Sequence, residues 1–174
     1  MKMQYISNNQ GLTEPNFLSK YYFFFIYNQI YKLIKNSNKN TILDFGCGKG
    51  YLKKLIKEKN LKVINYDVVN ELTEIKNWKN CHFDLVVFSQ VLMYLEKSEV
   101  QHIFKHLKKV NSDLIVVFSN QNFLNKLGSY LFGHFKAHTG TKLKPSEEEK
   151  ILVENFKVKI CKNFLLFKIY YLTN

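Results

Sequence analysis

The sequence predicts an α/β fold with an open, mostly parallel sheet, and three observations support this. Continuous apolar runs rich in β-prone residues alternate with segments whose apolar residues have helical spacing. One of these runs passes directly into a loop with alternating glycines and then into a helix-like segment. The chain ends in two further β-prone runs, which are close enough to form an antiparallel hairpin.

The length and composition fit one globular domain. At 174 residues and 20.7 kDa, the chain is long enough for one hydrophobic core and too short for two ordinary domains. Its hydrophobic content of 46% is typical of folded proteins, and no repeat or linker divides it. We therefore expect a single domain over residues 1–174, with a polar arm at 1–16, a helix at 17–36 and an α/β core at 41–172.

The spacing of apolar residues also predicts the order of the elements. We expect helices over 17–36, 51–59, 98–110 and from 145 onward, and strands over 42–45, 61–66, 83–88, 113–118, 157–161 and 164–172. Ser98 and Gln101 have the spacing of a capping box, and Lys162–Asn163 would form a two-residue hairpin turn. Between 67 and 83 there is room only for a very short third strand, over about 72–75, or for none.

The segment Thr41–Gly50 is the centre of the functional argument. Its apolar strand has Asp44 near the end, and glycines follow at positions 46, 48 and 50. Such glycines let the backbone take positive φ and let a ligand lie close to the main chain. The start of the next helix adds unpaired N–H groups and a positive dipole end. We expect a nucleotide-like ligand at the carboxyl end of the first strand.

The spacing of this loop discriminates between ligands. A dinucleotide fingerprint reads G-x-G-x-x-G, which would put the third glycine one place after Gly50. Asp44 would repel a pyrophosphate but attract a ligand with an ammonium and a sulfonium group. A nicotinamide oxidoreductase is therefore disfavoured. The alternative is a strand–loop–helix corner in which the glycines serve geometry only.

The pattern Asp-x-Gly-x-Gly-x-Gly resembles motif I of the class I methyltransferases that use S-adenosyl-L-methionine, in particular small domains of the type 11 and 12 kind. The resemblance runs in order from about Ile42 to Leu172 and implies a Rossmann-like methyltransferase sheet. It also implies S-adenosyl-L-methionine as cofactor and S-adenosyl-L-homocysteine as product. The residues that it assigns to the amino acid end of the cofactor are Asp44, Gly46, Cys47, Gly48 and Gly50.

A second acid, Asp67, ends the expected second strand about twenty residues after the glycine loop. Dinucleotide-type units place at this separation an acid that accepts hydrogen bonds from ribose hydroxyls. We assign Asp67 and the adjacent Val68 to the cofactor, and the alternative for Asp67 is a solvated turn residue. The nearby candidates for contact with adenine are Glu74, Ile75, Asn77 and Trp78. Trp78 would fit a core position equally well.

The run Phe83–Leu95 resembles the fourth strand and the following loop of the same family, F-D-x-V-x-x-x-x-V-L-x-H-L. The resemblance places Ser89, Gln90 and Tyr94 at the reacting end of the cofactor. Tyr94 stands where many members have histidine, so a histidine base at this position is excluded. No Asn/Asp-Pro-Pro-aromatic signature occurs, which counts against methylation of an exocyclic base nitrogen in nucleic acid.

The long connection over 123–144 is the least regular part of the sequence. Long connections inside compact domains are usually functional or disordered, and in the resembling enzymes this stretch forms part of the acceptor pocket. His134 and His138 are therefore candidates, with Tyr94, for a contact to the acceptor or for a general base. They have no neighbouring carboxylate or cysteine, so we expect no metal site.

The formal charge of +12 would usually suggest an acidic partner such as nucleic acid. However, all 26 basic residues are lysine, and readers of phosphate and guanine depend on the planar arginine fork. Abundant lysine and asparagine also indicate a bias of coding composition. Nucleic acid is a possible partner that the sequence does not favour.

The cysteines and the amino-terminal sequence indicate a cytoplasmic protein. The three cysteines lie far apart, and no signal-like start is present. The aromatic run Tyr21–Leu33 is too short and too polar to span a bilayer, although its aromatics could contact a membrane surface. Its apolar stripe is explained by core packing, while in the resembling proteins a helix at this place often lies over the cofactor. The stripe is Tyr22, Phe23, Ile26, Tyr27, Ile30, Leu33 and Ile34.

The sequence thus favours a methyltransferase that acts on a small molecule or a sugar-containing metabolite by in-line transfer. A single domain without an added recognition module fits such an acceptor, and positioning alone can supply several kcal/mol of catalysis. The rival enzyme is an RNA methyltransferase, supported by the charge. A catalytically degenerate cofactor-binding partner protein is also compatible with the shrunken third strand and the missing histidine. The oligomeric state cannot be read from the sequence.

Overall fold

The elements expected from the sequence are present in a computed structural model, which describes residues 17–120 and 141–174. In chain order they are α1 (Phe17–Lys35), β1 (Thr41–Phe45), α2 (Tyr51–Leu55), β2 (Lys62–Tyr66), the 3-10 helix η2 (Trp78–Asn80), β3 (Leu85–Ser89), the 3-10 helix η3 (Leu92–Tyr94), α3 (Lys97–Lys109), β4 (Asp113–Ser119), α5 (Pro145–Asn155), β5 (Lys157–Asn163) and β6 (Phe167–Thr173). Within these two ranges, no helix is long and apolar enough to cross a membrane.

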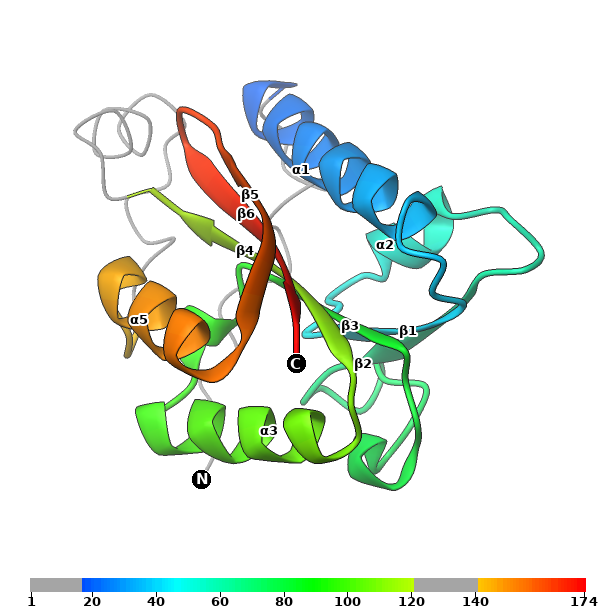
Figure 1. Cartoon of the computed structure of the whole chain (residues 1–174). Helices are drawn as coiled ribbons and strands as arrows, with labels where there is room; N and C mark the ends of the chain where they lie inside the picture. The colour runs from blue at the N-terminus through cyan, green and yellow to red at the C-terminus, as the bar shows by residue number, and fades with distance from the viewer. Residues whose placement is uncertain (1–16, 121–140) are drawn as a thin grey trace.

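The strands form one sheet in the order β2-β1-β3-β4-β6-β5 (Figure 1). The first four strands are parallel, β6 is antiparallel to β4, and β5 is antiparallel to β6. This confirms the predicted α/β fold with a terminal antiparallel hairpin. Because the four parallel strands all end at the same edge of the sheet, the loops after β1, β2 and β3 are brought together there.

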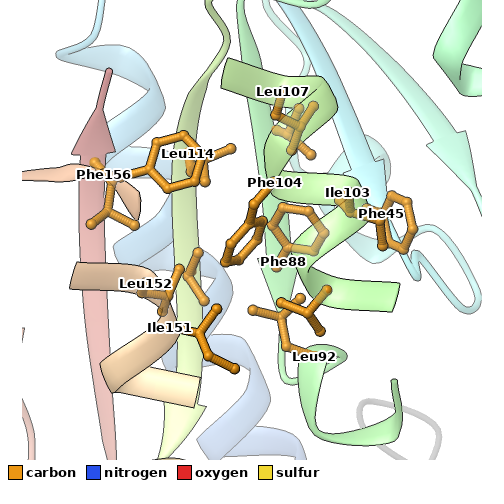
Figure 2. Packing of buried hydrophobic residues seen from close by; sticks show 14 of the residues in the cluster. Phe45, Phe88, Leu92, Ile103, Phe104, Leu107, Leu114, Ile151, Leu152 and Phe156 are labelled. Carbon is orange, nitrogen blue, oxygen red and sulfur yellow. The ribbon is translucent and has the colours of Figure 1, made fainter. Parts of the chain in front are cut away.

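Helices cover both faces of the sheet (Figure 1). On one face, Ile26, Ile30 and Leu33 of α1 pack with α2 residues onto the strands, as their helical spacing predicts. On the other face, α3 and α5 form a second core in which Phe104 of α3 packs edge-on against Phe88 of β3 (Figure 2). The parallel strands β1, β3 and β4 therefore have both faces buried, which explains their continuous apolar runs in the sequence, whereas the edge strand β2 is only partly buried.

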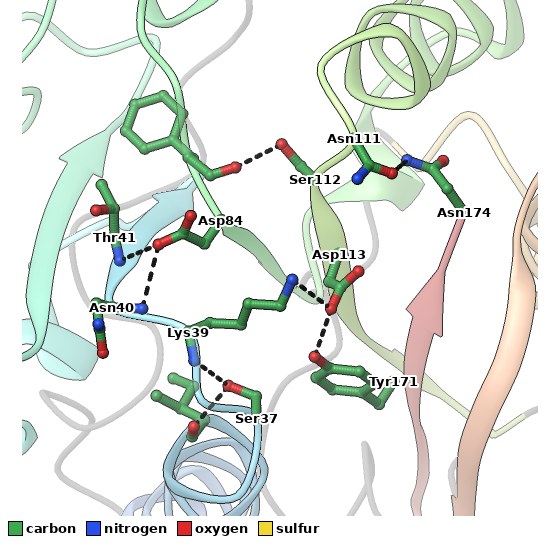
Figure 3. Close-up of polar contacts among 12 residues, drawn as sticks. Ser37, Lys39, Asn40, Thr41, Asp84, Asn111, Ser112, Asp113, Tyr171 and Asn174 are labelled. Atoms are coloured by element: carbon green, nitrogen blue, oxygen red, sulfur yellow. Dashed lines mark hydrogen bonds and ion pairs between the residues drawn. The ribbon is translucent and has the colours of Figure 1, made fainter.

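At the amino-terminal edge of the parallel strands, buried and half-buried acids have partners within the chain (Figure 3). Asp84 accepts hydrogen bonds from the backbone N–H groups of Asn40 (3.2 Å) and Thr41 (2.9 Å). Asp113 accepts one from the Tyr171 hydroxyl (2.7 Å) and pairs with Lys39 (3.0 Å). These acids fix the starts of the strands and are structural.

The helix predicted over residues 51–59 is wrong in length, because α2 ends at Leu55. The next residue, Ile56, has an extended backbone (φ −82°, ψ 113°) and is buried in the core beneath α1. Burial of Ile56 and a hydrogen bond from the Tyr31 hydroxyl to Glu58 hold the following residues outside the helix. Tertiary contacts thus outweigh the helical spacing of a short segment.

No strand lies between β2 and β3, where every residue is described, so the third strand is missing as one of the two expectations allowed. Its place on the outer edge of β2 is partly taken by Glu74. The Glu74 N–H donates to the Asn65 carbonyl (2.9 Å), and the Glu74 carboxylate accepts from the Asn65 N–H (2.9 Å). Lys53 also pairs with this carboxylate. Glu74 is therefore committed to the sheet edge.

Two local predictions are wrong in detail. The capping box of α3 is formed by Glu96 and Glu99 instead of Ser98 and Gln101, because the N-cap residue is Glu96, two residues before Ser98, and the helix begins at Lys97. The hairpin turn also differs: Lys162 and Asn163 belong to β5, and residues 164–166 make the connection. Phe164 stacks on Phe167 with ring centroids 4.7 Å apart, and this aromatic contact holds the longer turn closed.

Candidate cofactor site

Three polar side chains lie at the carboxyl ends of adjacent strands, next to the glycine loop. Asp44 of β1 is paired in register with Asn65 of β2, and Ser89 ends β3 on the other side of β1. Residues two positions earlier on each of these strands belong to the core on the α1 and α2 face. Because side chains alternate along a strand, all three polar side chains point to that face.

Asp44 is a buried acid without a full set of partners. Its residue is 2% exposed, and its Oδ2 atom has no hydrogen-bond donor in the part of the chain that is described. Burial, together with the charge of the nearby Asp67 carboxylate, raises the pKa of Asp44 to about 7. In contrast to Asp84 and Asp113 at the other edge of the sheet, Asp44 is therefore available to a cationic or hydrogen-bond-donating group of a ligand.

The glycine loop after β1 is tied to the end of β2. The N–H groups of Gly46 (2.8 Å) and Cys47 (3.1 Å) both donate to the Tyr66 carbonyl. Gly46 (φ +72°) lies against Val91, which follows β3, and a Cβ atom at Gly46 would overlap that side chain. Gly48 (φ +51°) differs, because a Cβ atom there would meet nothing within 4 Å. The loop therefore has a closed side at Gly46 and an open side at Gly48.

Asp67 lies directly after β2 and faces the same loop. Its Oδ2 atom accepts a hydrogen bond from the Gly48 N–H (3.0 Å), and its Oδ1 atom accepts one from the Val69 N–H (3.1 Å). Two backbone donors thus fix the orientation of a half-buried carboxylate. Each of its oxygens has a further lone pair, so Asp67 can still accept hydrogen bonds from a ligand.

A family model described as a methyltransferase domain matches residues 23–147, which includes all of the site described above. The chain belongs to this methyltransferase family. Comparison with curated protein sequences finds no match. Solved structures with the same fold include class I methyltransferases that depend on S-adenosylmethionine, which agrees with the sheet order and with the glycine loop.

Among these structures is magnesium protoporphyrin IX methyltransferase from Synechocystis PCC 6803 with bound S-adenosylhomocysteine, at 17% identity and a TM-score of 0.65, covering 92% of this chain and 89% of that one. The PH0226 protein from Pyrococcus horikoshii OT3 has 16% identity and a TM-score of 0.66, with 93% and 95% coverage. The methyltransferase domain of bacterial CtHen1 has 16% identity and a TM-score of 0.64, with 86% and 97% coverage. At these identities the likeness shows the fold.

In this methyltransferase, α1 contributes two tyrosines to the site that sequence reasoning assigned to core packing. Gln90, in the left-handed backbone region (φ +56°), donates from Nε2 to the Tyr22 hydroxyl (2.7 Å). Burial raises the pKa of Tyr27, and the charge of Asp44 raises it further, while a hydrogen bond with Ser89 opposes the shift. Tyr27 thus lies close to Asp44 and Ser89. The helical spacing of Tyr22 and Tyr27 was visible in the sequence, but this spacing does not distinguish site residues from core residues.

Tyr94 of the methyltransferase lies in η3, on the other face of the sheet from α1. It is half-buried, and its pKa is raised by burial and by the nearby Glu148 of α5. The segment before α5 is held against η3, because the Lys142 N–H donates to the Met93 carbonyl (2.7 Å). Glu148 was read from the sequence only as an acid in the first turn of a helix, so sequence reasoning missed its burial.

The structure therefore brings most of the predicted site residues to one edge of the methyltransferase sheet. These residues are Asp44, Gly46, Cys47, Gly48, Gly50, Asp67, Val68, Ser89 and Gln90. Val68 is 57% exposed, and Asn65 is a further polar residue that was not predicted. His134 and His138 lie outside the described residues. Within 17–120 and 141–174, no group of three or more metal-binding side chains could hold an ion.

The two sides of the glycine loop give a matched pair of variants. We expect Gly46→Ala to lower the free energy of unfolding by about 2–4 kcal/mol, because it combines left-handed backbone strain with overlap at Val91. Gly48→Ala should cost about 1–2 kcal/mol, since only the backbone strain applies. Urea unfolding of both variants measures the difference, and equal losses would contradict the closed and open sides assigned here.

Proposed function

We propose that this chain binds S-adenosyl-L-methionine at the glycine loop and transfers its methyl group to a small-molecule acceptor. The observation that carries the proposal is the pair of carboxylates at this loop. Asp44 is buried, with no partner for Oδ2 among the described residues, and Asp67 is oriented by two backbone N–H groups beside the open side at Gly48. Two acids would repel a phosphate-containing cofactor and would suit a cationic one.

The residues present fit this cofactor. The unpartnered oxygen of Asp44 would accept a hydrogen bond from the ammonium group, which would neutralise an otherwise uncompensated buried charge. Asp67 would accept hydrogen bonds from the ribose hydroxyls, and the open space beside Gly48 leaves room for the ligand next to the loop. When bound, the cofactor supplies an activated methyl group on sulfur. Tyr27, Ser89 and Gln90 would then hold its reacting end and exclude water.

A small molecule or a sugar-containing metabolite is the acceptor that we propose. The solved relatives do not determine this choice, because one is named for magnesium protoporphyrin IX and others as O-methyltransferases. Lysine supplies the entire basic charge, and the absence of arginine counts against specific recognition of RNA. RNA binding by lysines would weaken steeply with salt, so a salt series with RNA tests the rival acceptor class.

Mass spectrometry of the purified protein offers the most direct test of cofactor binding. Co-purified S-adenosylmethionine or S-adenosylhomocysteine would support the proposal. If neither molecule co-purifies and calorimetry with S-adenosylhomocysteine gives no binding heat, the proposal fails. Cofactor binding without transfer to any acceptor pool would instead support a degenerate partner protein.

Replacing the ribose-binding acid should weaken cofactor binding. We expect Asp67→Ala to lower the affinity for S-adenosylhomocysteine by about 10- to 100-fold, because hydrogen bonds to a charged group contribute about 1.5–3 kcal/mol. Isothermal titration calorimetry measures this loss. Glu71→Ala, which removes an exposed acid four residues away, is the control for the change in net charge. An unchanged affinity of Asp67→Ala would remove the assignment.

A further inference from the structure

A second buried acid, Glu148, lies on the opposite face of the sheet from Asp44 and has no role in the site described above. Its residue is 2% exposed, and its Oε2 atom has no hydrogen-bond donor in the described part of the chain. Burying a carboxyl group without a hydrogen-bond donor costs free energy, and such groups cluster at functional sites of proteins. The group therefore calls for an explanation beyond the stability of the fold.

The acids on either side of Glu148 in α5 have structural roles, because each is hydrogen-bonded within the fold. Glu147 accepts the Lys144 N–H (2.8 Å) within the capping box of the helix. Glu149 accepts hydrogen bonds from Lys168 (2.9 Å) and from the Tyr170 hydroxyl. Both neighbours are thus bound to the scaffold. Of the three, only Glu148 has a buried carboxylate oxygen without a partner among the described residues.

Packing connects Glu148 to the cofactor loop. Val91 presses on Gly46 of that loop, and η3 begins at the next residue. Tyr94 of η3 is close enough to Glu148 for the two groups to interact electrostatically. Hydrogen bonds from the N–H groups of residues 142 and 143 to the Met93 carbonyl fix the start of α5 on η3. Glu148 is therefore held beside the segment that follows β3, at the edge of the sheet where the cofactor loop lies.

We propose that Glu148 is the general base of the methyl transfer and accepts the proton of an O–H or N–H acceptor. This inference rests on the proposed function. As the acceptor oxygen or nitrogen forms its bond to the methyl carbon, the carbon–sulfur bond breaks with its electron pair left on sulfur. Glu148 takes the proton that the acceptor loses, so charge and atoms balance. A hydroxyl or amine acceptor also supplies the donor that Oε2 lacks.

The titration of Glu148 suits this role. Burial raises its pKa to about 8, so the carboxylate is a much stronger base than an exposed glutamate. The titratable group that faces it is Tyr94 of η3, whose own pKa is raised by burial and by Glu148. We therefore expect the wild-type transfer rate at saturating S-adenosylmethionine to rise with pH toward this value, and we expect a Glu148 variant to lack this rise.

The test compares Glu148→Gln with the wild type and with Glu154→Gln, which removes an exposed acid of the same helix. Transfer is followed with S-adenosylmethionine that carries a tritium-labelled methyl group, with the low-molecular-mass fraction of a cell extract as acceptor pool. We expect Glu148→Gln to lower the transfer rate by about 10²- to 10⁴-fold. Its affinity for S-adenosylhomocysteine should be unchanged, and Glu154→Gln should behave as the wild type.

A second readout needs no acceptor. Because glutamine does not ionise, Glu148→Gln should become more stable than the wild type as pH rises from 4.5 toward 8. A loss of methyl transfer together with this gain in stability supports the assignment of Glu148 as a base whose burial lowers the stability of the fold. An unchanged transfer rate in Glu148→Gln overturns the inference and leaves the proposed function intact. A wild-type protein that binds S-adenosylhomocysteine without transferring methyl groups overturns both the inference and the proposed function. A wild-type protein that binds neither S-adenosylmethionine nor S-adenosylhomocysteine also overturns both.

Discussion

Asp44→Asn should make the unliganded protein more stable at neutral pH while it weakens cofactor binding. Burial and the neighbouring Asp67 raise the folded-state pKa of Asp44 from 3.8 to about 7. Stability from this group is therefore fully present below pH 3.8 and is lost as pH rises toward 7. Asparagine does not ionise and escapes this loss, so the variant should gain up to about 4 kcal/mol by pH 7. Its affinity for S-adenosylhomocysteine should fall by about 10- to 100-fold, since a charge-assisted hydrogen bond is lost.

Urea unfolding at a series of pH values and calorimetry with S-adenosylhomocysteine measure the two effects. Asp84→Asn is the control, because the fold lowers the pKa of Asp84 whereas it raises the pKa of Asp44. Hydrogen bonds from the Thr41 and Asn40 N–H groups hold the pKa of Asp84 below its usual range. Its stabilising contribution is present above the ordinary aspartate pKa and is lost at acid pH, so Asp84→Asn should destabilise the protein at pH 7. A loss of stability in both variants at pH 7 would show that Asp44 has a structural partner.

Part of the site could be predicted from the sequence because its acids occupy fixed positions relative to the glycine loop. Asp44 and Asp67 were found because each ends a β-prone run at a fixed distance from the glycines, and that spacing is local. Parallel strands then bring their ends together in any sheet of this order. For the same reason, the order of helices and strands was predicted almost completely. The local sequence pattern was therefore sufficient to predict the fold and the position of the cofactor loop.

Residues that depend on packing between distant segments were not predictable in this way. Tyr27 lies near Asp44 only because α1 packs on this face of the sheet, and its spacing is the same as that of core residues. Glu148 resembles any first-turn acid of a helix until η3 packs over it. The early end of α2 depends on the burial of Ile56 beneath α1. In each case the deciding contact joins residues far apart in sequence.

Trp78 is the position at which the largest loss of stability from a single core substitution is expected. The missing third strand leaves β2 at the edge of the sheet, and Trp78 of η2 covers this part of the core. It is 5% exposed and lies edge-on to Phe45, with ring centroids 5.4 Å apart, and to His106 at 5.2 Å. Trp78→Ala would leave a large cavity and should lower the free energy of unfolding by about 3–5 kcal/mol.

Circular dichroism during urea unfolding measures this loss, and Trp78→Phe, which retains an aromatic ring, should cost clearly less. The same variants decide between the two roles that the sequence left open for Trp78. If the indole fills the core, stability falls and the remaining folded protein still binds S-adenosylhomocysteine with similar affinity. If it covers the adenine, affinity falls while stability is retained. The close packing of Trp78 between β1 and α3 favours the first result, because an indole enclosed by Phe45 and His106 has little surface left for a ligand.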